Sequence, residues 1–282
     1  MREKIMRAVF FCAACFSILA VALICVFLFM NGIPAMKEIG FAEFLLGRRW
    51  KPGNDQYGIF PMILGSIYVT AGAIIVGVPV GILTAVFMAE FCPEKLRRIF
   101  KPAVDLLAGI PSVVYGFFGL TVIVPFIRNT FGGNGSSMLA ASVLLGIMIL
   151  PTIISVSEAA IRAVPRSYYE GARALGATHE RGVFLTVIPA AGSGILAAVI
   201  LGIGRAIGET MAVIMVAGNQ ARMPAGLLKG VRTLTANIVI EMGYAADLHR
   251  EALIATGVVL FVFILIINLL FSAVKGRMGR KF

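Results

Sequence analysis

The chain has 282 residues and a formal net charge of +11; 59% of its residues are hydrophobic and only 14% are charged. Soluble domains have about 45–50% apolar and about 25% charged residues, so the composition excludes an ordinary soluble domain. A disordered chain would need low hydrophobicity. Nucleic-acid binding is excluded because the lysines and arginines occur in small groups between long apolar runs, not on one polar domain. We expect an all-α integral membrane protein.

Six apolar runs are each long enough to cross a bilayer as a helix, which takes about 20 residues. Placed by these runs and by turn residues, the predicted spans lie near 8–30, 62–89, 106–127, 138–158, 183–214 and 252–274. The first run has the charged start of a signal peptide, but its core exceeds the usual length of about 7–15 residues and no A-x-A site closes it. We therefore interpret it as a retained span and expect one membrane domain over residues 1–282.

The lysines and arginines predict the orientation of the spans, because cytoplasmic loops carry more of them. The N-terminus, the loops 90–105 and 159–182 and the C-terminal tail hold 15 of the 25 such residues, and the alternate loops hold nine. Both termini are therefore expected in the cytoplasm.

No motif for chemistry on this chain is found. The phosphate-cradling loop Gly-x-x-x-x-Gly-Lys-Ser/Thr does not occur, so an ATP-driven function needs a separate ATPase. Cys12 and Cys15 have the C-x-x-C spacing, but no second pair follows, which favours packing in a helix over a metal site. His179 and His249 lie at opposite ends of the predicted topology. We expect no catalytic residue, no metal site and no cofactor, so the chain is not predicted to be an enzyme.

The cytoplasmic loop 159–182 is predicted to be structured. Pro165 suits a first helical position and Gly176 suits a helix stop, which predicts a helix of about three turns between them. Thr178 can cap a second helix that leads to the fifth span. The pattern favours a rigid element that docks onto a cytoplasmic partner. The alternative is a helical hairpin that rests on lipid headgroups through its arginines.

This loop resembles the EAA loop of bacterial ABC importer permeases through Glu170, Gly171, Ala172, Gly176 and Pro189. In that family the loop forms the coupling helix that fits a cleft on the ATPase subunit. Gly171, Thr186 and Ile188 replace an alanine, an isoleucine and a leucine of the general pattern, which are mild changes. The literal letters Glu158–Ala160 lie at the end of a span, and we interpret them as unrelated to the motif.

Further stretches resemble the phosphate permeases within this family: 108–117, 147–153, 204–213, 234–238 and 249–253. They look closer to the PstC-type subunit than to its PstA-type partner. The resemblance implies a type I ABC importer permease with six transmembrane helices in the bacterial cell membrane. Besides membrane lipid, it implies three partners: a homologous second permease subunit (PstA-type), a cytoplasmic ATPase dimer (PstB-type) and an extracytoplasmic phosphate-binding protein (PstS-type).

Arg205 and Glu209 are the charges inside a predicted span, where a charge costs about 2.5–3.5 kcal/mol and therefore suggests function. Because they are four residues apart, we expect them on one helix face and in contact. In one interpretation Arg205 attracts a passing phosphate, and Glu209 holds Arg205 in place and stops the anion from binding too tightly to leave. Thr210 lines the same path. In the other, Arg205 and Glu209 form a structural salt bridge that locks helix packing.

The outer segments are expected to meet other components. In segment 31–60, Trp50 and Tyr57 suit the membrane interface. Segment 217–250 contains an apolar stretch that predicts a re-entrant or surface helix, and the resemblance implies that it meets a substrate-binding protein.

The leading hypothesis is a permease subunit that translocates inorganic phosphate, with ATP hydrolysed by a partner. Another oxyanion, such as sulfate or molybdate, would suit Arg205 equally well. A proton-coupled secondary transporter would predict inverted repeats, which the sequence does not show, and would leave the loop 159–182 unexplained. A membrane sensor or scaffold is the third alternative.

Overall fold

The computed structural model describes residues 2–278, which form helices, short connections and one two-stranded hairpin. In chain order the elements are α1 (Arg2–Ile39), α2 (Phe41–Leu46), β1 (Trp50–Lys51), the 3₁₀ turn η1 (Pro52–Asn54), β2 (Gln56–Tyr57), α3 (Phe60–Val86), the π-helical segment η2 (Phe87–Phe91), α4 (Glu94–Gly109), α5 (Ser112–Phe118), the π-helical segment η3 (Gly119–Ile123), α6 (Val124–Phe131), α7 (Met138–Arg162), α8 (Arg166–Ala174), α9 (His179–Gly182), the π-helical segment η4 (Val183–Val187), α10 (Ile188–Ala190), α11 (Gly192–Gly208), α12 (Met211–Val216), α13 (Leu234–Met242) and α14 (Asp247–Met278). The predicted all-α class is confirmed.

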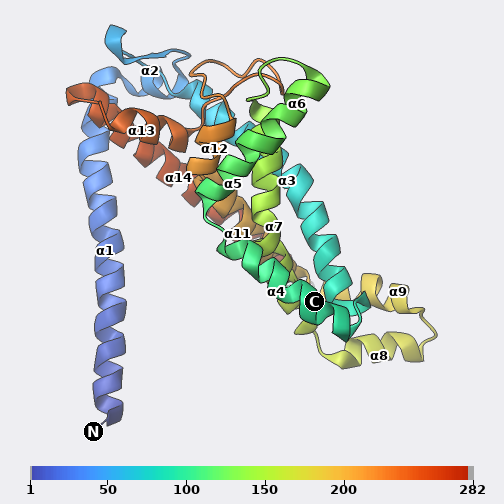
Figure 1. Ribbon diagram of the computed structural model, residues 1–282. Helices are drawn as coiled ribbons and strands as arrows, with labels where there is room; N and C mark the ends of the chain where they lie inside the picture. Colours follow the sequence, from blue (N-terminus) through green and yellow to red (C-terminus); the bar gives the residue numbers. More distant parts are fainter. Residues whose placement is uncertain (1, 279–282) are drawn as a thin grey trace.

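Five helical stretches are long and apolar enough to cross a membrane: Met6–Ile39, Phe60–Phe91, Ser112–Phe131, Met138–Arg162 and Asp247–Leu270. A bent pair, His179–Ala190 and Gly192–Gly208, makes a sixth span if it is counted as one, and its two parts differ in direction by 68°. The start of α1, the end of α14 and the loop α8–α9 lie at one end of the molecule, whereas α2, α6 and α13 lie at the other (Figure 1). This sidedness agrees with the predicted topology.

The centre of the bundle is α7, against which α3 and α11 pack. Glycines allow the close approach. A Cβ at Gly77 of α3 would lie 2.7 Å from the carbonyl oxygen of Gly146, and one at Gly202 of α11 would lie 2.9 Å from Ile153. Close helix packing on small residues is typical of membrane bundles, where lipid gives little hydrophobic drive for helices to associate.

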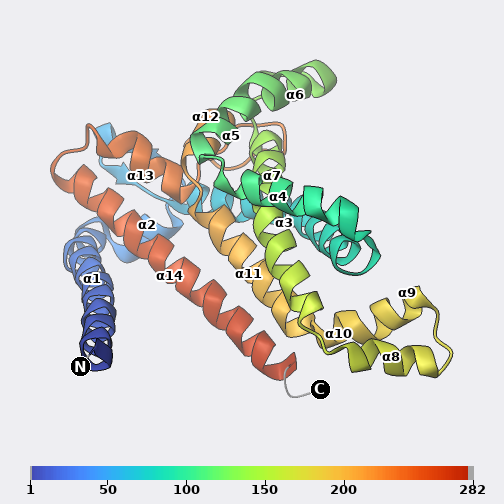
Figure 2. The same ribbon diagram turned by 60° about the horizontal axis from the view of Figure 1, so that its bottom comes forward.

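In contrast, α1 stands away from the bundle over most of its length (Figures 1 and 2). It packs on α14 only near its C-terminal end, where the rings of Phe29 and Phe261 lie 6.0 Å apart. The apolar side chains of its earlier turns therefore face outward in the single chain.

The third predicted span, 106–127, is wrong in its bounds. Helix α4 already begins in the predicted loop 90–105, and extended backbone at Ile110 and Pro111 (ψ 127° and 142°) separates it from α5. A proline disfavours helical backbone at the residue before it, which explains the interruption. Because α4 is amphipathic and carries charges on one face, a search for charge-free runs missed it.

The fifth predicted span, 183–214, is also not one continuous helix. The chain passes from η4 to α10, where Pro189 has no N–H to donate to the preceding turn, and bends at Ala191. It then stops being helical at Glu209, whose ψ is 130°.

Glu158, near the C-terminal end of α7, connects this helix to α4. Its Oε1 lies 3.2 Å from Nε of Arg97, and its Oε2 lies 3.2 Å from Nζ of Lys101. The helix continues to Arg162, so the letters Glu158–Ala160 do lie outside the loop, as predicted.

We expect Glu158→Ala to lower the melting temperature of the purified protein in detergent. The Glu158 side chain is only 4% exposed and bridges Arg97 and Lys101, so its loss removes charge-assisted hydrogen bonds between α7 and α4 at a cost of about 1–3 kcal/mol. Both cations are partly exposed and keep a second carboxylate partner, which limits the loss. Asp105→Ala is the matched control, because Asp105 also pairs with Lys101 but is 54% exposed, and such pairs contribute about 0–1 kcal/mol. Equal melting temperatures for the two variants would contradict the assignment.

Candidate functional site

Between α11 and α12 the fifth span is broken at Glu209 and Thr210. Non-helical backbone at membrane depth persists only where its polar groups find partners. Here the Thr210 hydroxyl donates to the Gly208 carbonyl (3.2 Å), and Oε1 of Glu209 accepts the N–H groups of Thr210 (3.1 Å) and Ala212 (3.2 Å). The carboxylate therefore caps α12, where unpaired N–H groups and the helix dipole favour a negative charge.

Arg205 lies one turn before this break and is partly exposed. Its Nη1 donates to the hydroxyl of Thr152 on α7, 3.4 Å away. This is the one hydrogen bond that the described part of the chain offers to its side chain, and a guanidinium has five N–H donors. Most of its donor capacity is therefore not used by residues 2–278.

The predicted contact between Arg205 and Glu209 is wrong: no salt bridge joins them within residues 2–278. The helix ends between the two residues, so the extended Glu209 sends its carboxylate forward onto α12 instead of back along α11. Spacing of four residues places side chains on one face only while the helix continues.

A second break, the extended backbone at Ile110 and Pro111 between α4 and α5, lies next to the break at Glu209 and Thr210. The segments that follow the two breaks, α5 and α12, pack directly on each other: a Cβ at Gly116 would lie 3.0 Å from Cα of Ala212 and 2.6 Å from Sδ of Met215. Across the other break, the Tyr115 hydroxyl donates to the Leu107 carbonyl (2.8 Å). Substrate sites of membrane transport proteins are typically built from discontinuous helices. The geometry therefore marks this pair of breaks as a candidate pathway site.

The loop α8–α9 confirms most of the structure predicted for 159–182. Pro165 directly precedes α8 instead of starting it, and Gly176, with φ of +85°, follows its end in a conformation that favours glycine. The Thr178 hydroxyl accepts the Arg181 N–H at 3.4 Å and caps α9. Glu180, in the first turn of α9, places a carboxylate at the positive end of the helix dipole.

The outward surface of α8 is open. Glu170 is exposed, a Cβ at Gly171 would meet nothing within 4 Å, and Leu175 is 91% exposed. Ala172 instead faces α9, because its Cβ would lie 3.9 Å from a Cβ at Gly182. An exposed carboxylate beside an exposed leucine suits a protein partner better than lipid headgroups, which attract basic residues.

The loop is anchored to the bundle through α9. The Tyr169 hydroxyl lies 2.8 Å from Nδ1 of His179, whose ring packs on Phe91 of η2 with centroids 4.7 Å apart. Sequence reasoning assigned His179 no role, because nothing in its local pattern points to Phe91.

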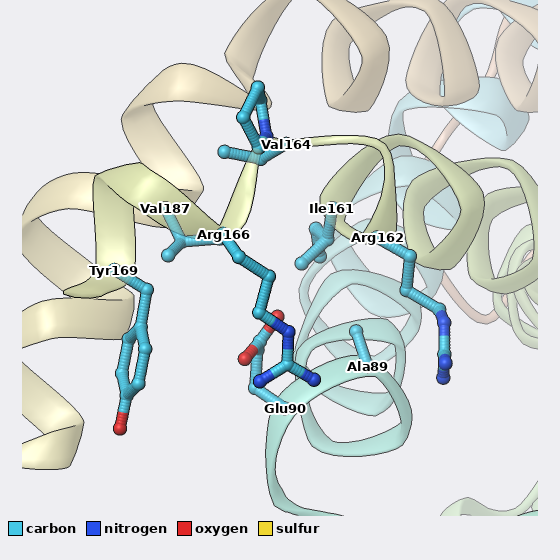
Figure 3. Close-up of a pocket in the computed structure, with 9 residues that line it drawn as sticks. Ala89, Glu90, Ile161, Arg162, Val164, Arg166, Tyr169 and Val187 are labelled. Carbon is cyan, nitrogen blue, oxygen red and sulfur yellow. The ribbon is translucent and has the colours of Figure 1, made fainter.

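On its other side the loop borders a pocket of about 150 Å³ at the ends of η2 and α7. Figure 3 shows Arg166 reaching toward the carboxylate of Glu90 across this pocket, while the Arg162 guanidinium points away. The start of α8 is thus less tightly packed than α9. Pro189, the last residue of the resembling motif, lies apart from α8 at the bend of the fifth span.

We expect Gly171→Ala and Gly176→Ala to have opposite effects on thermal stability. An alanine at Gly171 meets open space inside a helix and should stabilise α8 by about 0.5–1 kcal/mol. An alanine at Gly176 must adopt left-handed backbone at a cost of roughly 1–2 kcal/mol. Thermal unfolding of the two purified variants measures this difference, and a reversed order would contradict the assigned helix end.

Comparison with protein families gives a match over residues 77–280, to the binding-protein-dependent transport system inner membrane component. The chain is 39% identical over 280 residues to a probable ABC transporter permease protein, YqgH, of Bacillus subtilis, covering 95% of this chain and 91% of that protein. It is 38% identical over 256 residues to the phosphate transport system permease protein PstC of Mesorhizobium japonicum, covering 83% of this chain and 78% of that protein.

Solved structures of ABC transporters share the fold. A bacterial alginate ABC transporter, solved in complex with an alginate-bound periplasmic protein, gives a TM-score of 0.61 at 16% identity and covers 94% of both chains. The MetNI methionine ABC transporter gives 0.58 at 21% identity, covering 78% of this chain and 94% of its own. The predicted type I ABC importer permease fold is thus confirmed, and the chain belongs to the family of binding-protein-dependent transport system inner membrane components.

Proposed function

We propose that this multi-pass membrane protein is the permease subunit of an ABC importer and translocates inorganic phosphate. The observation that carries the proposal is the position of Arg205, a largely unpartnered guanidinium beside two facing helix breaks. The name of the Mesorhizobium japonicum relative supports phosphate as the substrate.

The chemistry of the break suits an anion that must bind and leave. The planar fork of Arg205 matches phosphate oxygens and can bind two of them at once. Glu209 already occupies the positive end of α12, so this helix end adds little further attraction. Conduction requires binding that is favourable but weak, and this balance of charges supports it. We place Thr210, which is partly exposed within the break, on the same path.

We propose that a separate ATPase dimer supplies the energy and that it docks on α8 through the surface around Glu170, Gly171 and Gly176. Ala172 packs behind this surface, toward α9. The chain lacks a phosphate-cradling loop of its own. The excess of basic residues supports a cytoplasmic location for α8–α9 and both chain ends. The opposite end, with α2, α6 and α13, then faces the extracytoplasmic binding protein, and a homologous permease subunit completes the pathway beside this chain's single membrane domain.

Reconstitution tests the proposal. The chain is purified with the second permease and ATPase subunits of the same importer, placed in proteoliposomes that contain ATP, and supplied with the phosphate-binding protein outside. We expect uptake of labelled phosphate that requires ATP and persists when the proton gradient is collapsed. Uptake that follows the proton gradient, or equal uptake of sulfate or molybdate, would contradict the proposal.

A further inference from the structure

We propose that Thr235 is a positioning residue that holds the break at Glu209 and connects it, through α13, to the outer end of the molecule. The inference rests on the proposed function, because it assigns a transmission role toward the same pathway site. It starts from the stretch 234–238, which resembles phosphate permeases and has so far no role in the mechanism.

A hydrogen bond connects the N-terminal end of α13 to the break at Glu209. The Thr235 hydroxyl donates to the carbonyl of Glu209 at 3.2 Å, and the Thr235 residue is only 7% exposed. Thr233 caps the same helix by accepting the N–H of Ala236 at 3.2 Å, and the Thr233 and Thr235 hydroxyls lie 3.1 Å apart. The hydroxyl of Thr235 is thus held in place by its neighbour while it contacts the broken backbone.

The same end of α13 is also fixed to the bundle. The N–H of Leu234 donates to the hydroxyl of Ser66 on α3 at 3.0 Å. Gly65, the residue before Ser66 in α3, leaves no room for a side chain, because a Cβ there would collide with the carbonyl of Arg232. The start of α13 therefore cannot shift without moving α3 or the break.

The other end of α13 is held by the buried carboxylate of Glu241. This carboxylate accepts a hydrogen bond from Nε1 of Trp50 (2.7 Å), pairs with Arg232 and lies 2.9 Å from Nε2 of His249. These partners come from the hairpin β1–β2, from the connection before α13 and from α14. Packing of the Trp50 and Tyr57 rings, with centroids 5.8 Å apart, extends the cluster along the hairpin.

A nine-residue helix fixed at both ends is a rigid strut of about 13 Å. Packed elements switch between discrete arrangements instead of deforming continuously. A shift of the hairpin and α13, as when a binding protein docks on this end, would therefore displace the Glu209 carbonyl and the carboxylate that caps α12. Segment 217–250 was predicted to hold a re-entrant or surface helix; the helix it contains is α13, which is mostly buried.

Thr235→Val tests the inference, because it keeps the shape of the side chain and removes the hydroxyl. In the proteoliposomes described above we expect the maximal uptake rate and the stimulation of ATPase by phosphate-loaded binding protein to fall by about tenfold, the effect of roughly one lost hydrogen bond. Basal ATPase activity, subunit assembly and the KM for the loaded binding protein should stay unchanged. Thr235→Ser, which restores the hydroxyl, should return both rates to within about twofold of wild type.

Thr256→Val is the matched control. Thr256 is a fully buried threonine whose one hydroxyl bond among the described residues stays within α14, to the Ala252 carbonyl, so its loss should leave stimulation unchanged. Trp50→Phe removes the indole donor at the far end of the strut and should lower stimulation without lowering basal activity. If Thr235→Val does not assemble with the other subunits, the result for Trp50→Phe tests the inference instead.

Three results would overturn the inference: wild-type stimulation in Thr235→Val, a serine variant as slow as the valine variant, or full stimulation in Trp50→Phe. The wild-type complex in the same assay separates the two proposals. Absence of phosphate uptake by wild type contradicts the proposed function, whereas equal uptake rates for wild type and Thr235→Val contradict only the strut.

Discussion

Arg205→Gln is expected to lower phosphate uptake by about 100-fold or more while the transporter complex still assembles, because a desolvated charge-assisted contact is worth roughly 3 kcal/mol. Glutamine can still donate a hydrogen bond toward Thr152, so the packing of α11 on α7 should survive. The neutral amide removes the positive charge that faces the helix breaks. Uptake of labelled phosphate, normalised to co-purified ATPase, measures the effect.

Arg222→Gln is the control, because it removes one exposed arginine from the outer connection and should leave uptake unchanged. Normal uptake in Arg205→Gln would exclude a pathway role. Loss of assembly would instead support a structural role for Arg205. Glu209→Gln examines the carboxylate separately, since an amide oxygen can still cap α12 but carries no charge.

We expect Glu170→Arg to abolish binding of the ATPase subunit to this chain. Glu170 is exposed on α8 and forms no ion pair within the described residues, so reversing its charge should leave the fold of the chain intact. Like charges brought together at an interface cost several kcal/mol. We expect co-purification of the ATPase to fall below detection, and Leu175→Asp, on the same open surface, to have the same effect.

Glu251→Arg is the matched control for this reversal: the residue is exposed too, but it lies in α14 near the opposite end of the molecule. It should bind the ATPase as wild type does. If Glu170→Arg also retains the ATPase, α8 does not dock on it. The alternative of a hairpin on lipid headgroups would then be favoured, and binding of the chain's loop to anionic vesicles would measure it.

The parts of the fold that local chemistry determines were predictable from the sequence. Apolar runs predicted six spans because a bilayer requires about 20 apolar residues from each helix, and the structure has five such stretches and one bent pair. The helix α8, its end at Gly176 and the cap at Thr178 followed from residues within a few positions of one another. The basic residues predicted which elements share one end of the molecule.

What the sequence could not predict depends on contacts between distant residues or on where a helix stops. The distance between Arg205 and Glu209 was mispredicted because the break between α11 and α12 has no strong local signal beyond Gly208 and Thr210. Thr235 reaches Glu209 across 26 positions, and Trp50 reaches Glu241 across 191. No periodicity within one helix encodes such pairs.

The loop α8–α9 and the helix breaks lie in different parts of the chain, with the length of α11 between them (Figure 2). This separation has a genetic consequence. Under the proposed function, a chain altered at Arg205 would still present α8 and would therefore sequester ATPase and partner subunits in inactive complexes. A chain altered at Glu170 would not engage the ATPase and would leave it free. In a cell that also expresses the unaltered chain, the first class of allele should be dominant and the second recessive.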